Sequence, residues 1–353
     1  ILGQIAAEIR VQVHQVKAAV ELLDGGATVP FIARYRKEAT GGLDDIQLRE
    51  LEHRLGYLRE LEDRREAVLK SIGEQGKLTA ALRAAIDAAP TKQELEDLYL
   101  PFKPRRRTKG QMAREAGIEP LADRLFADPA LNPATEAVAF VKAEKGEGGE
   151  DFTTVPAVLD GVRDILSERW AEDPALVQSL RAWLWTEGLF KSRLASGKDE
   201  NNPAVAKFRD YFDYDEPIGR VPSHRALAVF RGRQLEILDA KLVLPEEPEP
   251  GQPSIAEGRI ALHLGWRHAG RPADDLIRKC VAWTWRVKLS MSTERDLFTR
   301  LREEAEKVAI KVFGDNLRDL LLAAPAGPRV VMGLDPGIRT GVKVAVVDAT
   351  GKL

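Results

Sequence analysis

The sequence has a single cysteine among its 353 residues, Cys280, and no long apolar run. One cysteine can form neither an internal disulfide nor a thiolate zinc cage. The longest wholly apolar runs are short, such as residues 320–324, whereas a membrane-spanning helix needs about 20 apolar residues. Glu8 and Arg10 interrupt the start, which therefore does not match a secretory signal. We expect a cytoplasmic protein without a membrane partner.

The sequence also lacks an excess of charge of one sign. Its 53 Lys and Arg residues face 55 Asp and Glu residues, for a net charge of −2. This excludes a uniformly basic protein of the histone type, but not a local basic patch. Walker A, G-x-G-x-x-G and G-x-S-x-G motifs are missing, so three common enzyme classes are unsupported. The five histidines show no metal-ligand spacing, and we expect no metal or other cofactor.

Most of the chain shows the periodicity of helices. Apolar side chains recur three or four residues apart over residues 4–24, 44–75 and 78–89. The first range predicts one helix, and the other two predict a long helical hairpin. Thr91 and Glu94 match a capping box, which predicts that another helix starts there. These patterns predict a mainly α fold.

The last 25 residues change in character. Residues 330–334 and 342–347 are typical of β-strands, and together they predict a β-hairpin. A two-stranded hairpin is marginal alone, so we expect the chain to be cut just inside a further domain. The domains we predict are a helical domain at 1–200, a second helical region at 201–325 with an acidic, proline-rich connector at 245–253, and the truncated start of an α/β domain at 326–353.

Asp335 follows the first of these strands, in the sequence Asp-Pro-Gly-Ile-Arg-Thr-Gly. An acidic residue there opens either an RNase H-like site, as the first Mg²⁺ ligand, or an actin-type site whose turn cradles phosphate. The plainer interpretation is an ordinary hairpin turn. Only one carboxylate, Asp348, follows, so this chain alone cannot assemble a two-metal site, and we assign no catalytic residue.

Residues 103–114 hold six cations and no acid, which suits contacts with nucleic-acid phosphates that weaken steeply with salt. The alternative is a solvated loop that pairs with acids in residues 94–97. The candidate phosphate contacts here are Lys103, Arg105, Arg106, Arg107 and Lys109.

Residues 34–37 form a second basic group, in which Tyr35 could stack on a base. The alternative is a helix corner whose cations pair with Glu38, Asp44 or Asp45. The candidate contacts here are Arg34, Arg36 and Lys37, and the sequence ranks them second to those of residues 103–109. A third stretch, residues 266–288, mixes cations with three tryptophans, and a core helix with a charged outer face explains it more simply.

Four motifs of this sequence resemble those of the bacterial Tex family, transcription accessory proteins related to a eukaryotic elongation factor. They are Thr-Val-Pro-Phe-Ile-Ala-Arg-Tyr-Arg-Lys-Glu with Thr-Gly-Gly-Leu-Asp-Asp in residues 28–45, Leu-Glu-Asp-Leu-Tyr-Leu-Pro-Phe-Lys at 95–103, Pro-Ser-His-Arg-Ala-Leu-Ala at 222–228, and Gly-Leu-Asp-Pro-Gly-Ile-Arg-Thr-Gly at 333–341. Their combined length and order make the resemblance specific, and it covers nearly the whole chain.

The resemblance implies a helical amino-terminal region with a helix-turn-helix-like part. A YqgF domain of RNase H-like fold, helix-hairpin-helix modules and an S1 domain would follow, with this chain ending just inside the YqgF domain. It implies no catalytic role for Asp335.

With the basic segments, the resemblance favours a non-enzymatic transcription accessory protein that binds RNA or DNA weakly and without sequence preference. This chain would be its helical scaffold. One alternative is a metal-dependent RNase H-like nuclease or resolvase in the full-length form. Another is a protein-interaction scaffold for the transcription machinery.

Overall fold

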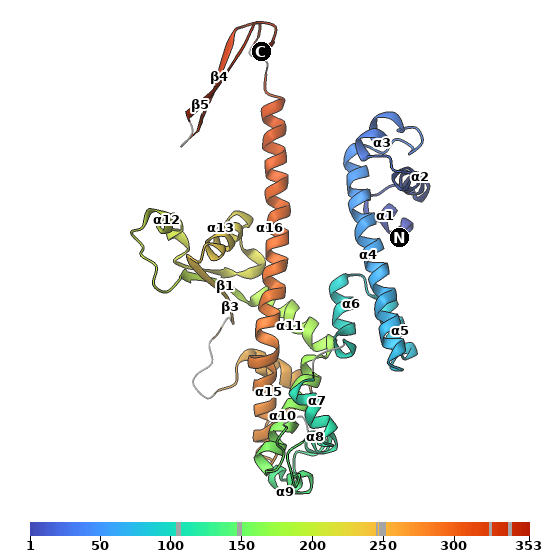
Figure 1. Ribbon diagram of the computed structural model, residues 1–353, viewed down its shortest axis with the longest axis vertical. Coiled ribbons are helices and arrows are strands. Elements are labelled where there is room, and N and C mark those ends of the chain that lie inside the picture. The colour runs from blue at the N-terminus through green and yellow to red at the C-terminus, as the bar shows by residue number, and fades with distance from the viewer. Residues whose placement is uncertain (104–106, 147–149, 245, 247–251, 325–326, 338–340) are drawn as a thin grey trace. The chain divides into compact units, whose positions relative to one another are not determined.

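The computed structural model describes residues 1–103, 107–146, 150–244, 246, 252–324, 327–337 and 341–353 (Figure 1). The chain divides into two units: Ile1–Leu184 with Glu246–Thr293, and Trp185–Pro245 with Glu294–Leu353. The fold is mainly α and ends in an antiparallel β-hairpin, which confirms the predicted fold class. The predicted domain boundaries after residues 200 and 325 stay a prediction.

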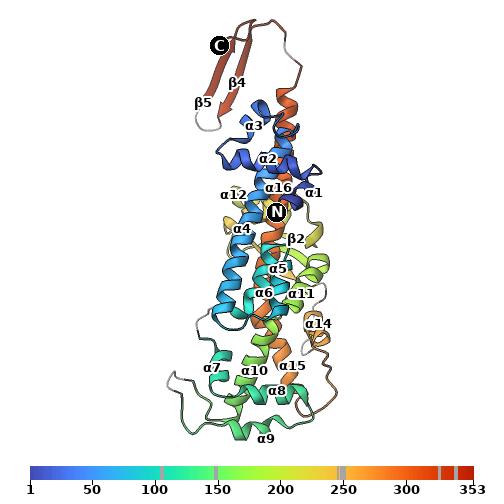
Figure 2. The same cartoon turned by 90° about the vertical axis from the view of Figure 1, so that its right-hand side faces the viewer.

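The first six helices share one hydrophobic core within the first unit. They are α1 (Leu2–Glu8), α2 (Val13–Asp24), α3 (Val29–Tyr35), α4 (Asp45–Glu74), α5 (Ala80–Ala88) and α6 (Lys92–Tyr99). Helices α2 and α3 lie at the amino-terminal end of α4, and α5 lies near its other end (Figure 2).

The prediction of a single helix over residues 4–24 is wrong. Arg10 adopts a left-handed backbone with φ of 57°, and the Val11 N–H donates to the Ala6 carbonyl at 2.9 Å. This turn separates α1 from α2 while Ile5, Ile9 and Val16 all stay buried. Apolar spacing continues across the turn, and so the break cannot be recognised from the periodicity.

The predicted helical hairpin is confirmed. The Asp44 carboxylate accepts from the Gln47 N–H at 2.7 Å, and the Gln47 side chain accepts from the Asp44 N–H at 3.1 Å, which fixes the start of α4. Apolar residues of α4, from Leu48 to Ile72, are buried along one stripe. The Arg65 guanidinium donates to two carbonyls at the end of α5, and this ties the returning helix to α4.

The rest of the first unit contains α10 (Val155–Ala171), which packs against α7 (Lys109–Glu115), α8 (Glu119–Ala127), α9 (Pro133–Ala137) and α15 (Asp274–Trp283). The other elements of this part are η1 (Leu100–Phe102), η2 (Val138–Phe140), α11 (Pro174–Glu187), α14 (Ile255–His263) and the π-helix η5 (Thr284–Leu289). Gly161 of α10 lets other segments approach closely, because a Cβ there would lie 3.1 Å from Ile118 and Phe152 side-chain atoms. Helix α11 runs on into the second unit.

The second unit contains a three-stranded antiparallel sheet in the order β2-β1-β3. Its elements are β1 (Leu189–Leu194), α12 (Pro203–Ala206), η3 (Arg209–Tyr211), β2 (Asp213–Pro217), η4 (Ile218–Arg220), α13 (Ser223–Gln234), β3 (Leu238–Val243) and most of α16 (Ser290–Leu321). Phe190, Phe230 and Phe298 form its aromatic core, with ring centroids 5.2–5.8 Å apart. At the sheet edge, the Leu242 N–H donates to a Glu294 carboxylate oxygen of α16 at 2.8 Å.

The sequence pattern does not predict this sheet. Each strand has only five or six residues, and polar side chains such as Lys191 and Asp215 interrupt the apolar ones. The strands also pair across tens of residues, so no local turn signal joins them.

The chain ends in the predicted hairpin of β4 (Val331–Gly337) and β5 (Gly341–Val347). Met332 pairs with Val346 and Leu334 with Val344, which puts four apolar residues on one face. Within the described part of the chain, no helix is both long and apolar enough to span a bilayer.

Candidate nucleic-acid interface

Helix α3 is a short helix with one buried and one exposed side. Thr28 has an extended backbone, and Pro30 stands in the first turn, where its missing N–H costs no hydrogen bond. Val29 and Ile32 are buried and anchor the helix in the core. The opposite side presents Phe31, Arg34 and Tyr35 to solvent.

The turn that follows α3 is held from within and from a neighbouring helix. The buried Thr40 hydroxyl donates to the Lys37 carbonyl at 3.1 Å. From α2, the Gln15 side chain donates to the Gly41 carbonyl at 2.8 Å. Gly41 has φ of +64°, and a Cβ there would lie 3.0 Å from Gln15 Nε2, so this position favours glycine. These contacts fix the backbone that carries Arg36 and Lys37.

Five residues of α3 and this turn form what we call the α3 face: Phe31, Arg34, Tyr35, Arg36 and Lys37. Phe31 is 40% exposed and Tyr35 60% exposed, and their ring centroids lie 5.3 Å apart. The Arg36 guanidinium lies 5.4 Å from the Phe31 centroid, and that of Arg34 lies 6.0 Å from the Tyr35 centroid. Cations and rings are therefore interleaved on one surface.

The cations of the α3 face form no ion pair with any acid in the described residues. The acids expected to neutralise them act elsewhere, because Asp44 caps α4 and Asp45 pairs with Arg49 at 2.9 Å. Burial of Ile32 agrees with the helix-corner interpretation, but exposure of Phe31 and Tyr35 does not. Neither Glu38 nor Asp44 nor Asp45 forms an ion pair with a cation of the α3 face.

The described part of residues 103–114 is organised differently. Lys103 Nζ lies 2.9 Å from Glu96 Oε2, and Arg107 donates to Glu115 at 2.7 Å and to Glu150 at 2.9 Å. Lys109, in the first turn of α7, is exposed and has no ion-pair partner among residues that the structure describes. The candidates Arg105 and Arg106 lie outside the described residues.

Two acids that bind cations of this segment, Glu115 and Glu96, have lowered pKa values. Hydrogen bonds from Gln111 and Arg107 lower the pKa of Glu115. Burial opposes ionisation of Glu96, but hydrogen bonds from Arg64 and Lys103 outweigh it and lower the Glu96 pKa. Both carboxylates therefore stay charged at neutral pH, and they compete with any phosphate for Lys103 and Arg107.

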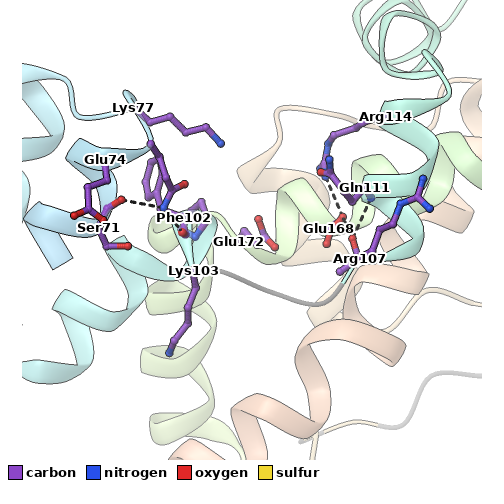
Figure 3. Close-up of a pocket in the computed structure, with 13 residues that line it drawn as sticks. Ser71, Glu74, Lys77, Phe102, Lys103, Arg107, Gln111, Arg114, Glu168 and Glu172 are labelled. Atoms are coloured by element: carbon purple, nitrogen blue, oxygen red, sulfur yellow. Dashed lines mark hydrogen bonds and ion pairs between the residues drawn. The ribbon is translucent and has the colours of Figure 1, made fainter. Parts of the chain in front are cut away.

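A pocket of about 490 Å³ lies beside this segment (Figure 3). Within it Glu168, only 5% exposed, accepts from Thr108 Oγ1 and Arg114 Nη1, each at 3.1 Å. The charged lining residues are Lys77, Lys103, Arg107 and Arg114 together with Glu74, Glu168 and Glu172. Charges of both signs line the pocket, so it is not a purely basic site.

In the third basic stretch, residues 266–288, three cations pair with acids of the fold: Arg271, Arg278 and Arg286. Asp274, fully buried, accepts from Trp266 Nε1 at 3.1 Å and from Arg271 at 2.9 Å. Arg286 pairs at 2.8 Å with Glu257, which is also buried. Here the structure agrees with the interpretation as core helix and charged outer face.

The described residues contain no cluster of three or more His, Cys, Asp or Glu side chains that could hold a metal ion. Asp335 is exposed in the terminal hairpin, and its carboxylate lies 3.8 Å from Lys343 Nζ. An RNase H-like metal site needs further carboxylates beside Asp335, and the described part of the hairpin provides none.

The sequence predicts the cations of the α3 face as candidate contacts, but it does not predict the roles of Gln15 and Thr40, which hold the turn after α3. The available signal was the Thr-Gly-Gly run at 40–42, which marks a tight turn directly after a basic group. No local signal pointed to Gln15, because it lies 26 residues before Gly41.

Comparison with known proteins gives three matches in sequence order. A Tex-like protein N-terminal domain matches residues 1–73, a Tex central region-like domain matches residues 128–313, and a Tex protein YqgF-like domain matches residues 329–353.

Individual relatives align along nearly all of the chain. Protein YhgF of Escherichia coli (strain K12) is 58% identical over 99% of this chain, and Transcriptional accessory protein Tex of Neisseria gonorrhoeae is 51% identical over 99%. S1 RNA-binding domain-containing protein 1 of Homo sapiens is 29% identical over 95% of the chain, which covers 33% of that protein. The chain spans 44% of the length of each of the two bacterial relatives. The expected resemblance is confirmed: the chain belongs to the Tex family.

Proposed function

We propose that this chain is the helical scaffold part of a cytoplasmic, non-enzymatic transcription accessory protein, and that it binds RNA or DNA weakly and without sequence preference. The observation that carries the proposal is the α3 face, where three cations without acidic partners flank two exposed rings. The names of the Neisseria and human relatives, which mention transcription and RNA binding, support it. The transcription machinery is the further partner that we propose.

The charge environment ranks the two candidate segments. A phosphate that approaches Arg34, Arg36 and Lys37 displaces counterions only, and that release favours binding. A phosphate that approaches Lys103 or Arg107 must first displace a carboxylate. We therefore assign the main backbone contacts to the α3 face, and auxiliary contacts to the candidates in residues 103–109.

The test removes the charge of the α3 face. In the variant Arg34→Gln/Arg36→Gln/Lys37→Gln, affinity for a 20-nucleotide strand should fall at least about tenfold at low salt, and the salt slope should become shallower by roughly 2. Fluorescence anisotropy at several salt concentrations measures both.

The matched control also removes three exposed cations, but ones paired with acids on α2, α4 and α5: Lys17→Gln/Arg49→Gln/Arg83→Gln. It should bind like the wild type. If both triple variants lose affinity equally, only net charge matters and the assignment to the α3 face is wrong. If neither loses affinity, the nucleic-acid role of this face is wrong.

A further inference from the structure

The two edges of the three-stranded sheet in the second unit differ in what lies against them. Strand β1 is central, and β2 and β3 are the edge strands. In an antiparallel pair, every second residue turns its backbone N–H and C=O toward the neighbouring strand, and the residues in between turn theirs away. The ladder bonds at the strand ends therefore show which groups of each edge strand point outward.

The β3 edge is contacted by the chain's own long helix. The Ala195 N–H donates to the Ile237 carbonyl at 2.9 Å, which sets the alternation between β1 and β3. In this register Leu242 turns its N–H away from β1. There the N–H donates to the Glu294 carboxylate of α16 at 2.8 Å, so a donor of this edge is already occupied.

The β2 edge has no such contact. The Ile218 N–H donates to the Gly188 carbonyl at 2.8 Å, and in this register Asp213 and Asp215 turn their N–H and C=O away from β1. Neither N–H meets an acceptor in the described residues, and both aspartates are exposed. The outward backbone groups of these two residues, which we call the β2 edge, are thus available to another strand.

We propose that the β2 edge docks an extended basic segment of a partner protein, which adds a fourth strand to the sheet. In strand addition of this kind, backbone hydrogen bonds supply affinity and every second side chain supplies specificity. The inference names a protein partner and does not depend on nucleic-acid binding by the α3 face.

The β2 edge is preformed. Tyr214, between the two aspartates, is only 8% exposed, and its ring centroid lies 5.6 Å from that of Tyr211. Its hydroxyl donates to Glu216 Oε2 at 3.0 Å. These contacts hold β2 extended, so docking does not have to order this strand. Pro217, the next outward-pointing residue, has no N–H and ends the row of donors.

Charge on the exposed side of the sheet favours a basic segment. Asp213 stands opposite Arg193, and its carboxylate lies 2.6 Å from that guanidinium. Asp215 stands opposite Lys191 and forms no ion pair within the part of the chain that is described. Side chains of an added strand would lie about 5 Å from these aspartates, where Lys or Arg is favoured and Asp or Glu is repelled. A partner with a cation at every second position therefore fits this edge.

The same two aspartates disfavour other occupants. A second copy of this chain that paired through its own β2 would bring aspartates against aspartates, which is destabilising. A nucleic acid would bring its phosphates to carboxylates and not to cations. The basic peptide is the occupant that satisfies both the backbone groups and the charge.

The experiment uses the 353-residue chain and a labelled peptide of about seven residues in which Lys and Val alternate. Near 0.15 M salt, which screens nonspecific attraction, this peptide should bind at least about tenfold more tightly than one of the same composition with Lys and Val in two blocks. Fluorescence anisotropy measures both affinities. Equal affinities, or no binding of either peptide, overturn the proposal.

Backbone pairing is tested on the peptide, which leaves the fold of the protein untouched. One derivative carries methyl groups on the backbone nitrogens of all Lys residues, and another carries them on those of all Val residues. A docked strand pairs through one of its two edges, so one derivative should lose binding and the other should keep it. Loss in the Lys derivative indicates an antiparallel strand, and loss in the Val derivative a parallel one. Equal affinities of the two derivatives overturn strand addition.

Two variants of the protein form a matched pair, Asp215→Asn and Asp239→Asn. Both acids are exposed and stand opposite a cation of β1, but Asp239 lies on β3. Asp215→Asn should weaken binding of the alternating peptide severalfold, and Asp239→Asn should not. Equal losses would mean that net charge alone attracts the peptide, and the assignment to the β2 edge would be wrong.

Asp215→Pro removes the outward N–H together with the carboxylate. Proline is tolerated where the N–H of an edge strand faces solvent, so thermal melts should show a folded chain. Affinity for the alternating peptide should fall at least about tenfold. Binding like that of the wild type would contradict the assignment.

Discussion

The α3 face and residues 103–114 are both short and basic, yet their described cations have different neighbours in the fold. Lys103 and Arg107 meet carboxylates, whereas the guanidinium groups of Arg34 and Arg36 lie near aromatic rings. Density of charge along the sequence is therefore a poor guide to availability of charge on the surface. What decides it is the origin of the neighbours: the Glu150 that binds Arg107 comes from 43 residues further along the chain.

The largest expected effect is a loss of stability on replacement of Glu168, the buried carboxylate that pairs with Arg114 of residues 103–114. Replacement of this buried carboxylate by alanine leaves Arg114, whose side chain is 24% exposed, without its main partner. We expect Glu168→Ala to lower the free energy of unfolding by about 2–3 kcal/mol, measured by urea denaturation.

The matched control is Glu115→Ala, because Glu115 pairs with Arg107 in an exposed position of the same segment. It should unfold like the wild type. Equal stability of the Glu168 variant would show that burial does not strengthen these pairs.

The next effect concerns the turn that carries the α3 face. Gly41→Ala forces a Cβ into the left-handed region and against Gln15, which should lower stability by about 1 kcal/mol and weaken strand binding severalfold. Gly42→Ala is the matched control, since Gly42 also has positive φ but no atom within 4 Å of the added Cβ. Thermal melts and anisotropy measure the two. If both variants bind equally well, the contact with Gln15 does not position the face.

A smaller effect should follow when residues 103–114 lose their acidic partners, because their cations then become unpaired like those of the α3 face. Glu115→Gln/Glu150→Gln frees Arg107 from both carboxylates and should raise strand affinity about two- to threefold at low salt. The control Glu21→Gln/Asp87→Asn removes two acids elsewhere that pair with exposed cations. A gain of equal size in the control would mean that net charge, and not release of Arg107, explains the effect.

The smallest effect is the response to pH. The pKa values of Glu96 and Glu115 are lowered, so both carboxylates stay charged above the unfolded pKa near 4.3 and release their cations only as pH falls through the lower folded values. Between pH 7 and 5, strand affinity should therefore stay constant. A rise in affinity over this range, measured by anisotropy at fixed salt, would show that these acids release their cations earlier.

Local signals were sufficient for part of this fold. The Thr91 cap at the start of α6, the apolar stripe of α4 and the two β-rich runs at the end are short-range features, and α6, the helical hairpin and the β-hairpin follow from them. The three-stranded sheet could not be predicted, because its short strands pair across tens of residues.

The candidate site also has a part that local sequence predicts and a part that depends on the tertiary fold. Arg34, Arg36 and Lys37 could be named as a basic group beside an aromatic residue, because these features are adjacent in sequence. That they lack acidic partners among the described residues, while Arg107 has two, depends on which distant acids the tertiary structure delivers. The spacing of neighbouring residues in the sequence does not show which distant acids lie close to a cation in the fold.

The bond from the Leu242 N–H to Glu294 bears on how the second unit avoids aggregation. Strand β3 is an edge of its sheet, and an edge strand normally offers unpaired N–H groups to any strand from another molecule. Because a carboxylate of its own long helix already occupies one of these donors, a foreign strand would have to displace a charge-assisted hydrogen bond before it could pair there. Glu294 thus occupies one donor through which another strand could pair with β3.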